Sequence, residues 1–453
     1  MSRVQPARQV ALDVLRAVAD DDAYANLLLP ARIVRAGLDA QDAALATELT
    51  YGTLRMSGYY DRVVALAARR PADAIDPALL DVLRLGVHQL LSTRVAAHAA
   101  VDESVELARQ VGSRAGTGFV NGVLRTVGRS TPDEWRERVL AAATSDDDRL
   151  AAEWSHPVWV IRALRRSLAA EGRQDELVDL LAADNVPPRV SLVALPGLAE
   201  PSELGGDDAL LSPLARVSAG GDPAQQPVVR TGRARVQDEG SQLAALLLSR
   251  HHDASPGERW LDMCAGPGGK AALLAAEAAR VGAHLVANEL VPARVGLVRQ
   301  ALAAVPGDVD VREGDAVRFG VDEPGGYQRI LLDAPCTGLG ALRRRPEARW
   351  RKQPGDVGEL TRLQADLLAS ALDALAPGGL LAYVTCSPHL AETRAIVESG
   401  LRRRDDVELL DGPEAVARVA VGEVDLASGP YVQLWPHRQG TDAMFVALVQ
   451  KKA

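Results

Sequence analysis

From Gln237 to the end of the chain, short apolar segments that suit β-strands alternate with longer segments of helical periodicity. This alternation predicts a mostly parallel sheet with helices on both faces. We expect strands at Arg259–Met263, Ala283–Glu289, Val309–Arg312, Arg329–Leu332, Leu380–Thr385 and Ala443–Val449. We expect helices at Gly268–Val281, Pro292–Ala303 and Val357–Ala376. In open sheets of this kind, ligands bind beyond the carboxyl ends of the strands.

The first part of the chain has a helical pattern. Apolar residues between Ala7 and Val18 keep helical spacing. Similar amphipathic stretches follow at Ala43–Leu54, Tyr60–Ala68, Pro77–Leu91, Val101–Val111 and Phe119–Val127. We therefore expect a multidomain chain that begins with an all-α helical bundle over residues 1–144. A small α/β connecting subdomain is expected over residues 145–236, followed by the sheet domain over residues 237–453. The connecting subdomain is expected to contain strands at Arg189–Leu195 and Val228–Val236.

Cysteine content and hydropathy indicate the compartment. The chain has 3 cysteines among its 453 residues, an odd number that argues against a disulfide framework and favours a reducing environment. The N-terminus lacks the apolar core of a signal peptide, and no apolar run reaches the ~18 residues that span a bilayer. We therefore expect a cytoplasmic protein without a membrane partner.

The net charge of −9 argues against a nucleic-acid partner, since phosphate neutralisation needs Lys and Arg. Residues 340–352 are an exception, with six positive charges, one negative charge and Trp350, an aromatic that could stack on a base. Alone, such a run is as well explained by a solvated loop. The run directly follows a loop over residues 333–338, which contains Cys336 in a segment of small residues, and this position favours contact with RNA.

Chemically active side chains follow the expected strands at their carboxyl ends. Asp262, Glu289, Asp315, Asp333 and Cys386 each fall at or just after such an end. Because parallel strands end at the same edge of a sheet, these five residues should converge on one cleft. Taken singly, each acid is better explained as a helix cap or a surface carboxylate; their order along successive strands favours a site.

The glycine-rich loop at residues 265–270 narrows the ligand. It has neither the spacing of a phosphate-binding P-loop nor that of the dinucleotide fingerprint. Its glycines allow the backbone to approach a ligand closely, and Lys270 can meet a carboxylate. Glu289 is placed to accept hydrogen bonds from the ribose hydroxyls, and Asp315 is placed to accept a hydrogen bond from an adenine amino group. A nucleoside with an amino-acid tail and no phosphate fits, which predicts S-adenosylmethionine as the cofactor.

Three segments carry a family resemblance. Residues 262–270 (DMCAGPGGK), 333–340 (DAPCTGLG) and 385–388 (TCSP) resemble the RNA cytosine-C5 methyltransferases. The helical half resembles the RNA-binding domain of the antitermination factor NusB, and that fusion is typical of the 16S ribosomal RNA methyltransferase B group. The resemblance implies a Rossmann-like class I methyltransferase domain. It also implies a monomer that acts on 16S rRNA or an early small-subunit assembly intermediate.

The resemblance assigns roles to the two motif cysteines. Carbon 5 of cytosine is too electron-poor to attack a methyl sulfonium until a thiolate adds to carbon 6. By resemblance, Cys386 is that nucleophile, Cys336 assists release of the product, and Asp333 holds or donates a proton at N3. We expect no metal site, because a zinc site needs more ligands at closer spacing. The predicted cofactor-binding residues are Cys264, Ala265, Gly266, Pro267, Gly268, Gly269, Lys270, Glu289, Arg294, Asp315 and Asp333.

Three other functions compete with this one. A transfer RNA cytosine methyltransferase has the same catalytic half, and only the helical bundle favours ribosomal RNA. A DNA cytosine methyltransferase uses a Pro-Cys thiol as its nucleophile, which would make Cys336 the attacking residue and leave Cys386 idle. A non-catalytic RNA-binding assembly protein is disfavoured by the complete cofactor loop and by the presence of both thiols.

Overall fold

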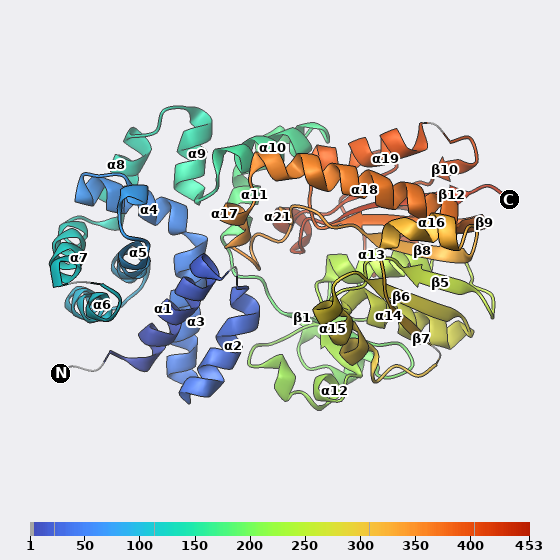
Figure 1. Ribbon diagram of the computed structural model, residues 1–453, viewed down its shortest axis with the longest axis horizontal. Coiled ribbons are helices and arrows are strands. Elements are labelled where there is room, and N and C mark those ends of the chain that lie inside the picture. Colours follow the sequence, from blue (N-terminus) through green and yellow to red (C-terminus); the bar gives the residue numbers. More distant parts are fainter. Residues whose placement is uncertain (1–3, 22, 113, 308, 403) are drawn as a thin grey trace. The chain divides into compact units, whose positions relative to one another are not determined.

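The computed structural model describes residues 4–21, 23–112, 114–307, 309–402 and 404–453. The chain divides into two compact units (Figure 1). Unit 1 is Met1–Arg162 together with Leu342–Arg351, and unit 2 is Ala163–Ala341 together with Lys352–Ala453. The predicted order, a helical region followed by an α/β domain, is confirmed. The boundaries at residues 144 and 236 stay predictions.

Unit 1 is built from helices around one apolar core. They are α1 (Pro6–Asp20), α2 (Ala25–Ala36), α3 (Ala40–Arg55), α4 (Ser57–Ala68), α5 (Pro77–Ser92), α6 (Ala97–Val111), α7 (Arg114–Val127), α8 (Pro132–Ala141) and α9 (Asp146–Trp154). Side chains at helical spacing, such as Val10, Val14 and Leu83, are buried in that core. Helix starts are specified locally, since Asp76 accepts hydrogen bonds from two backbone N–H groups of the first turn of α5.

The basic segment Leu342–Arg351, which contains α17 (Ala348–Arg351), packs within unit 1. The Arg349 side chain is fully buried and donates hydrogen bonds to the carbonyl oxygens of Arg55 (2.9 Å) and Ser155 (3.1 Å). Arg351 lies over the Tyr24 ring, 4.8 Å from its centroid. The expectation that this run contacts RNA is therefore wrong for Arg349, because its charge satisfies buried carbonyl groups of the helical unit.

The main sheet of unit 2 has the strand order β10-β12-β9-β8-β5-β6-β7, and β11 pairs with β12. Its strands are β5 (Arg259–Asp262), β6 (His284–Glu289), β7 (Val309–Glu313), β8 (Tyr327–Asp333), β9 (Leu375–Thr385), β10 (Val407–Leu409), β11 (Val432–Gln433) and β12 (Phe445–Lys451). The pairs β9–β8, β8–β5, β5–β6 and β6–β7 are parallel, and β12 runs antiparallel to β9. The predicted parallel sheet is confirmed.

Helices cover both faces of this sheet (Figure 1). Alternate strand residues point to opposite faces, so Leu331 and Ala382 pack with one set of helices and Leu332 and Tyr383 with the other. The first set is α13 (Glu239–Ser249), α14 (Gly269–Val281), α15 (Pro292–Leu302) and α20 (Gly412–Val419). The second set is α16 (Phe319–Asp322), α18 (Pro354–Ala374) and α19 (Arg394–Leu401). Three other helices belong to neither set: α10 (Val158–Ala169), α11 (Leu177–Asp184) and α21 (Pro436–Gln439).

A smaller antiparallel sheet of order β2-β3-β1-β4 precedes the main one. Its strands are β1 (Ser191–Ala194), β2 (Asp207–Asp208), β3 (Ala215–Val217) and β4 (Ala234–Val236). Of the strand expected over Val228–Val236, only Ala234–Val236 forms, because Pro227–Arg230 forms the short helix α12. Pro227 occupies the first turn of that helix, a position where proline lacks no needed hydrogen bond. Among the described residues, no helix is both long and apolar enough to cross a bilayer.

Replacing Arg349 with Ala should destabilise unit 1. The change leaves the buried carbonyl groups of Arg55 and Ser155 without their donor, and we expect a loss of about 2–4 kcal/mol in the free energy of unfolding. Chemical denaturation followed by circular dichroism measures this loss. Arg345→Ala is the matched control, since Arg345 is exposed and loses only its contact over the Tyr24 ring, so it should change stability by less than about 1 kcal/mol. Equal effects of the two substitutions would contradict the assigned role of Arg349.

Candidate active site

The five predicted strand-end residues lie along one edge of the main sheet. Cys386 directly follows β9, Asp333 ends β8, Asp262 ends β5, Glu289 ends β6, and Asp315 lies just after β7. Because these strands are neighbours in that order, the five residues follow one another along the edge. The topology thus brings the two thiols beside Asp333 and the other acids.

The two cysteine loops touch. Cys336 Sγ lies 3.5 Å from Cys386 Sγ. Gly340 fixes the end of the Cys336 loop, because its N–H donates to the Cys386 carbonyl oxygen and its own carbonyl accepts from the Ala443 N–H, both at 2.8 Å. A Cβ at Gly340 would lie 2.2 Å from the Ala443 carbonyl oxygen, so only glycine fits this position.

The two thiols have different surroundings, and their pKa values shift in opposite directions. The hydrogen bond between the two thiols lowers the pKa of Cys386, with help from the positive charge of Lys270, although burial and the charge of Asp333 oppose the shift. The same hydrogen bond, together with burial, raises the pKa of Cys336 well above its usual value. Since the thiolate is the nucleophilic form, these shifts favour ionisation of Cys386 over ionisation of Cys336.

Lys270 and Asp333 form an ion pair beside the thiols. Lys270 Nζ donates to Asp333 Oδ2 at 2.8 Å, and the lysine side chain is only 11% exposed. Burial alone would lower the pKa of Lys270, but the charge and hydrogen bond of Asp333 outweigh burial and raise it. The ammonium group therefore stays charged, and Asp333 keeps its second oxygen available to a ligand.

Asp262 is the group that most strongly indicates a ligand. It is 1% exposed, and neither carboxylate oxygen accepts a well-formed hydrogen bond from the described residues. Burial and the nearby charge of Asp333 raise the pKa of Asp262 to about 8, although Lys270 acts in the opposite direction. The Cys264 backbone N–H also acts on this carboxyl group. A buried acid with so few hydrogen-bond partners is costly unless a bound molecule supplies a further hydrogen-bonding group. The amino-acid end of S-adenosylmethionine carries such a group.

The glycine-rich loop is tied to Glu289. The Gly266 N–H donates to Glu289 Oε2 at 3.1 Å, the Val291 N–H donates to Oε1 at 2.9 Å, and Arg294 pairs with the same carboxylate at 3.6 Å. Arg294 also donates to the Gly266 carbonyl oxygen. A Cβ at Gly266 would lie 2.1 Å from Glu289 Oε2, so the loop can approach this acid only with glycine. Glu289 and Arg294 thus shape the loop predicted to hold the cofactor.

A hollow of about 200 Å³ lies at the carboxyl ends of β6 and β7. Asn288, Gly314, Asp315 and Phe319 line it. Asp315 Oδ1 accepts from the Val317 N–H at 3.1 Å, which leaves Oδ2 for an amino group. The position and polarity of this hollow suit the adenine end of S-adenosylmethionine, and the residues present fit that cofactor. Cys264 packs against the core, and burial raises the pKa of its thiol, which opposes a role as a nucleophile.

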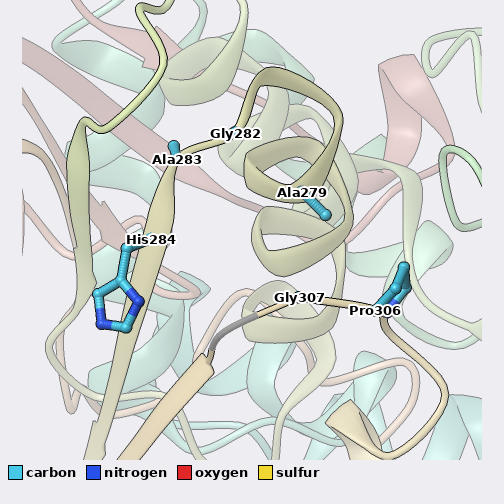
Figure 2. Close-up of a pocket in the computed structure, with 6 residues that line it drawn as sticks. All are labelled: Ala279, Gly282, Ala283, His284, Pro306 and Gly307. Atoms are coloured by element: carbon cyan, nitrogen blue, oxygen red, sulfur yellow. The ribbon is translucent and has the colours of Figure 1, made fainter.

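A second hollow, of about 550 Å³, is not connected with this chemistry. Figure 2 shows its six lining residues, Ala279, Gly282, Ala283, His284, Pro306 and Gly307. His284 begins β6, whereas the predicted site residues follow the other end of the strands. The hollow contains none of the predicted site residues.

Sequence reasoning missed Glu392, although this acid touches both cysteine loops. Glu392 is fully buried and accepts hydrogen bonds from Thr337 and from Ser387, the residues that follow Cys336 and Cys386. It ends the 3-10 turn Leu390–Glu392, which has no periodic pattern. Its distance of six residues from Cys386 is the one local signal.

Comparisons with known proteins agree with this geometry. Residues 250–450 match the family described as 16S rRNA methyltransferase RsmB/F, and residues 5–129 match the NusB family. A putative methyltransferase from Mycobacterium tuberculosis is 47% identical over 99% of this chain and 97% of its own length. The ribosomal RNA small subunit methyltransferase B of Pseudomonas putida is 32% identical over 89% of this chain and 91% of its own length.

The chain belongs to the RsmB/F methyltransferase family. The resemblance predicted from the motifs is confirmed, as are the NusB-like helical domain and the family's cofactor, S-adenosylmethionine. The crystal structure of PH0851 has the same fold, with a TM-score of 0.81, 21% identity and full coverage of both chains. A methyltransferase homolog from Pyrococcus horikoshii, with a TM-score of 0.51 and 23% identity, covers 64% of this chain and 98% of its own.

Replacing Lys270 with Met should make Cys386 less acidic. The ammonium group stabilises the Cys386 thiolate, so its loss raises the pKa of Cys386 and moves the acid limb of the rate–pH profile to higher pH. We expect the alkylation rate of Cys386 by iodoacetamide at pH 7 to fall roughly 3- to 10-fold. Peptide mass spectrometry without cofactor or RNA measures this rate. Lys452→Met, a change at an exposed residue near the C-terminus, is the control. An unchanged profile for Lys270→Met would exclude the proposed charge effect.

Proposed function

We propose that this RsmB/F family member transfers a methyl group from S-adenosylmethionine to carbon 5 of a cytosine in 16S ribosomal RNA, through a covalent adduct with Cys386. The observation that carries the proposal is the contact of the two thiols, 3.5 Å apart, at the ends of neighbouring parallel strands. A reaction that needs only a nucleophile can proceed with one thiol. A second thiol in contact with the first suits a reaction in which a covalent bond to the enzyme must form and later break.

The first step is addition. The Cys386 thiolate forms a bond to carbon 6 of the cytosine, and the electrons of the carbon 5–carbon 6 double bond shift toward N3. N3 takes a proton, and Asp333, which lies at the adjoining strand end, is the group proposed to deliver or hold that proton. Lys270 keeps Asp333 in place through their 2.8 Å hydrogen bond. The product of this step is a ring with a nucleophilic carbon 5.

The bound cofactor supplies an electrophilic methyl group on a sulfonium. Carbon 5 of the adduct forms a bond to that methyl group as the methyl–sulfur bond breaks and its electron pair stays on the sulfur, so carbon 5 then carries both a methyl group and its original proton. The cofactor loop, which Glu289 and Arg294 hold, starts at the strand end next to that of Asp333. The chain therefore orients the base and the methyl donor from adjoining strands.

The last step is elimination. Loss of the carbon-5 proton restores the carbon 5–carbon 6 double bond, the electrons of the carbon 6–sulfur bond leave with Cys386 Sγ as a thiolate, and N3 gives back the proton that it took up during addition. In the adduct, Cys386 carries no negative charge and accepts no hydrogen bond from Cys336, which removes the largest cause of the raised pKa of Cys336. Cys336 can then lose its own proton to solvent and act as the base that accepts the carbon-5 proton.

The proposed substrate rests on the relatives and on the helical unit. Relatives from Pseudomonas putida and Serratia proteamaculans carry the name ribosomal RNA small subunit methyltransferase B. Unit 1 matches the NusB family. These likenesses favour 16S rRNA, alone or in an early assembly intermediate, over transfer RNA. A monomer in the cytoplasm stays our prediction for the assembly and the location.

Bisulfite sequencing of RNA from a deletion strain tests the function. We expect one cytosine of 16S rRNA to lose its methyl group in the deletion strain and to regain it when the intact gene is supplied. The Cys386→Ala variant should not restore the methyl group, because addition to carbon 6 cannot occur. Loss of methylation at a transfer RNA site with 16S rRNA unchanged would overturn the substrate. Full restoration by Cys386→Ala would overturn the mechanism.

A further inference from the structure

A buried acid joins the two cysteine loops. Glu392 has no exposed surface and lies at the end of the 3-10 turn that follows Cys386. Its Oε1 accepts from the Thr337 N–H at 2.8 Å, and its Oε2 accepts from the Thr337 hydroxyl at 2.5 Å and the Ser387 hydroxyl at 2.6 Å. One carboxylate thus holds the residue after Cys336 and the residue after Cys386.

Further hydrogen bonds fix the position of Glu392 itself. The Tyr383 hydroxyl donates to the Glu392 carbonyl oxygen at 2.7 Å, from within strand β9. Gln364 of α18 donates to the Pro335 carbonyl oxygen at 2.7 Å and to Glu392 Oε1 at 3.3 Å. The acid is therefore anchored to the sheet, to a helix and to both loops. A group with so many buried partners is rigid, and a change in it reaches both cysteines.

Charges of opposite sign act on the two thiols. The negative charge of Glu392 is among the causes that raise the pKa of Cys336, after the hydrogen bond to Cys386, burial and the charge of Cys386. The positive charge of Lys270 is among the causes that lower the pKa of Cys386. A thiolate is disfavoured near an acid and favoured near an ammonium group. Lys270 and Glu392 therefore both favour a Cys386 thiolate beside a protonated Cys336.

We propose that Glu392 is a positioning residue that holds the two cysteine loops together and keeps the proton of the pair on Cys336, so that Cys386 is the nucleophile. The proposal deepens the function given above and rests on it. Glu392 does not touch the substrate in this account. It acts through Thr337 and Ser387 on the distance between the thiols, and through its charge on the choice of the thiol that ionises.

The other charged groups near the pair are accounted for as well. Asp333 and Asp442 disfavour the Cys386 thiolate, and Lys270 favours it. Burial and the charge of Arg166 lower the pKa of His389, which lies three residues after Cys386, although the charge of Glu392 acts in the opposite direction. Burial therefore favours the neutral imidazole at His389. Among the charges that act on Cys336, those of Glu392 and Cys386 both favour its protonated form.

The test is the reactivity of each thiol in the Glu392→Gln variant. The amide keeps one oxygen to accept from the Thr337 N–H, and its NH₂ group can donate to the two hydroxyl groups, so the change removes the charge with little loss of contact. The full-length protein is treated with iodoacetamide from pH 6 to pH 9.5 without RNA, and peptide mass spectrometry follows Cys386 and Cys336 separately. We expect the ratio of their rates at pH 7.5 to fall about tenfold or more.

Two further variants separate charge from contact. Ser387→Ala leaves the charge of Glu392 in place and removes one of its links, so Cys386 should react somewhat more slowly while Cys336 stays unreactive. Glu239→Gln is the matched control, because the buried Glu239 also accepts backbone N–H groups, those of Leu210, Leu211 and Ser212, but none from a cysteine loop. It should leave the rate ratio unchanged. Methylation by Glu392→Gln should show a lower kcat with an unchanged KM for the cofactor.

Folded Glu392→Gln protein with a wild-type rate ratio and pH profile overturns the proposal. If Glu392→Gln does not fold, Ser387→Ala decides, and an unchanged Cys386 rate in that variant overturns the proposal as well. Because alkylation needs no RNA, the result is independent of the methylated base. A wild-type protein that shows a reactive Cys386 but no RNA methylation would refute the proposed function and leave the role of Glu392 intact.

Discussion

The parallel pairing of β8 with β9 is the constraint on which the site depends. Asp333, the last residue of β8, lies opposite Val384 of β9, and the pairing continues as the Ala334 N–H donates to the Val384 carbonyl oxygen at 2.9 Å. Because both strands end at the same edge, the loops that follow them begin side by side. Thiols fifty residues apart in the sequence therefore meet at 3.5 Å. A register shift of this pair would separate the thiols.

The other charged groups of the site make the two thiols differ in acidity. Lys270 favours a charge on Cys386, while Glu392 disfavours a charge on Cys336. The hydrogen bond between the thiols then has its donor at Cys336 and its acceptor at Cys386. Two chemically identical side chains acquire different roles because their neighbours differ in charge. This difference is the physical basis on which we assign attack to Cys386 and release to Cys336.

The sequence predicted the sheet domain well because its signals are local. Strands ending in acids, followed by glycine and by amphipathic helices, predicted the parallel strands and the edge where Asp262, Glu289 and Asp333 lie. Short elements were missed where a local signal was weak or misleading. Pro30 interrupts the pattern of α2, yet the helix continues through it. Pro227 starts a helix where apolar residues suggested a strand.

The long-range contacts could not be predicted from the same signals. Nothing in the spacing of residues 340–352 indicates that Arg349 is buried against the carbonyl groups of the helical unit. Glu392 can contact both cysteine loops only because the two loops lie side by side. The order of the strands in the sheet determines that arrangement. The lack of a well-formed hydrogen bond to the buried Asp262 side chain is a property of the folded chain, although the position of Asp262 at a strand end is visible in the sequence.

In the proposed mechanism, Cys386 attacks carbon 6 of the cytosine and Cys336 assists release of the product. The most direct measurement is the covalent protein–RNA adduct formed with cytosine-containing RNA and S-adenosylmethionine, resolved by denaturing electrophoresis and located by peptide mass spectrometry. We expect Cys336→Ala to accumulate an adduct on Cys386 and Cys386→Ala to form none. An adduct on Cys336 that accumulates in Cys386→Ala, with none in Cys336→Ala, would contradict this assignment of the two thiols.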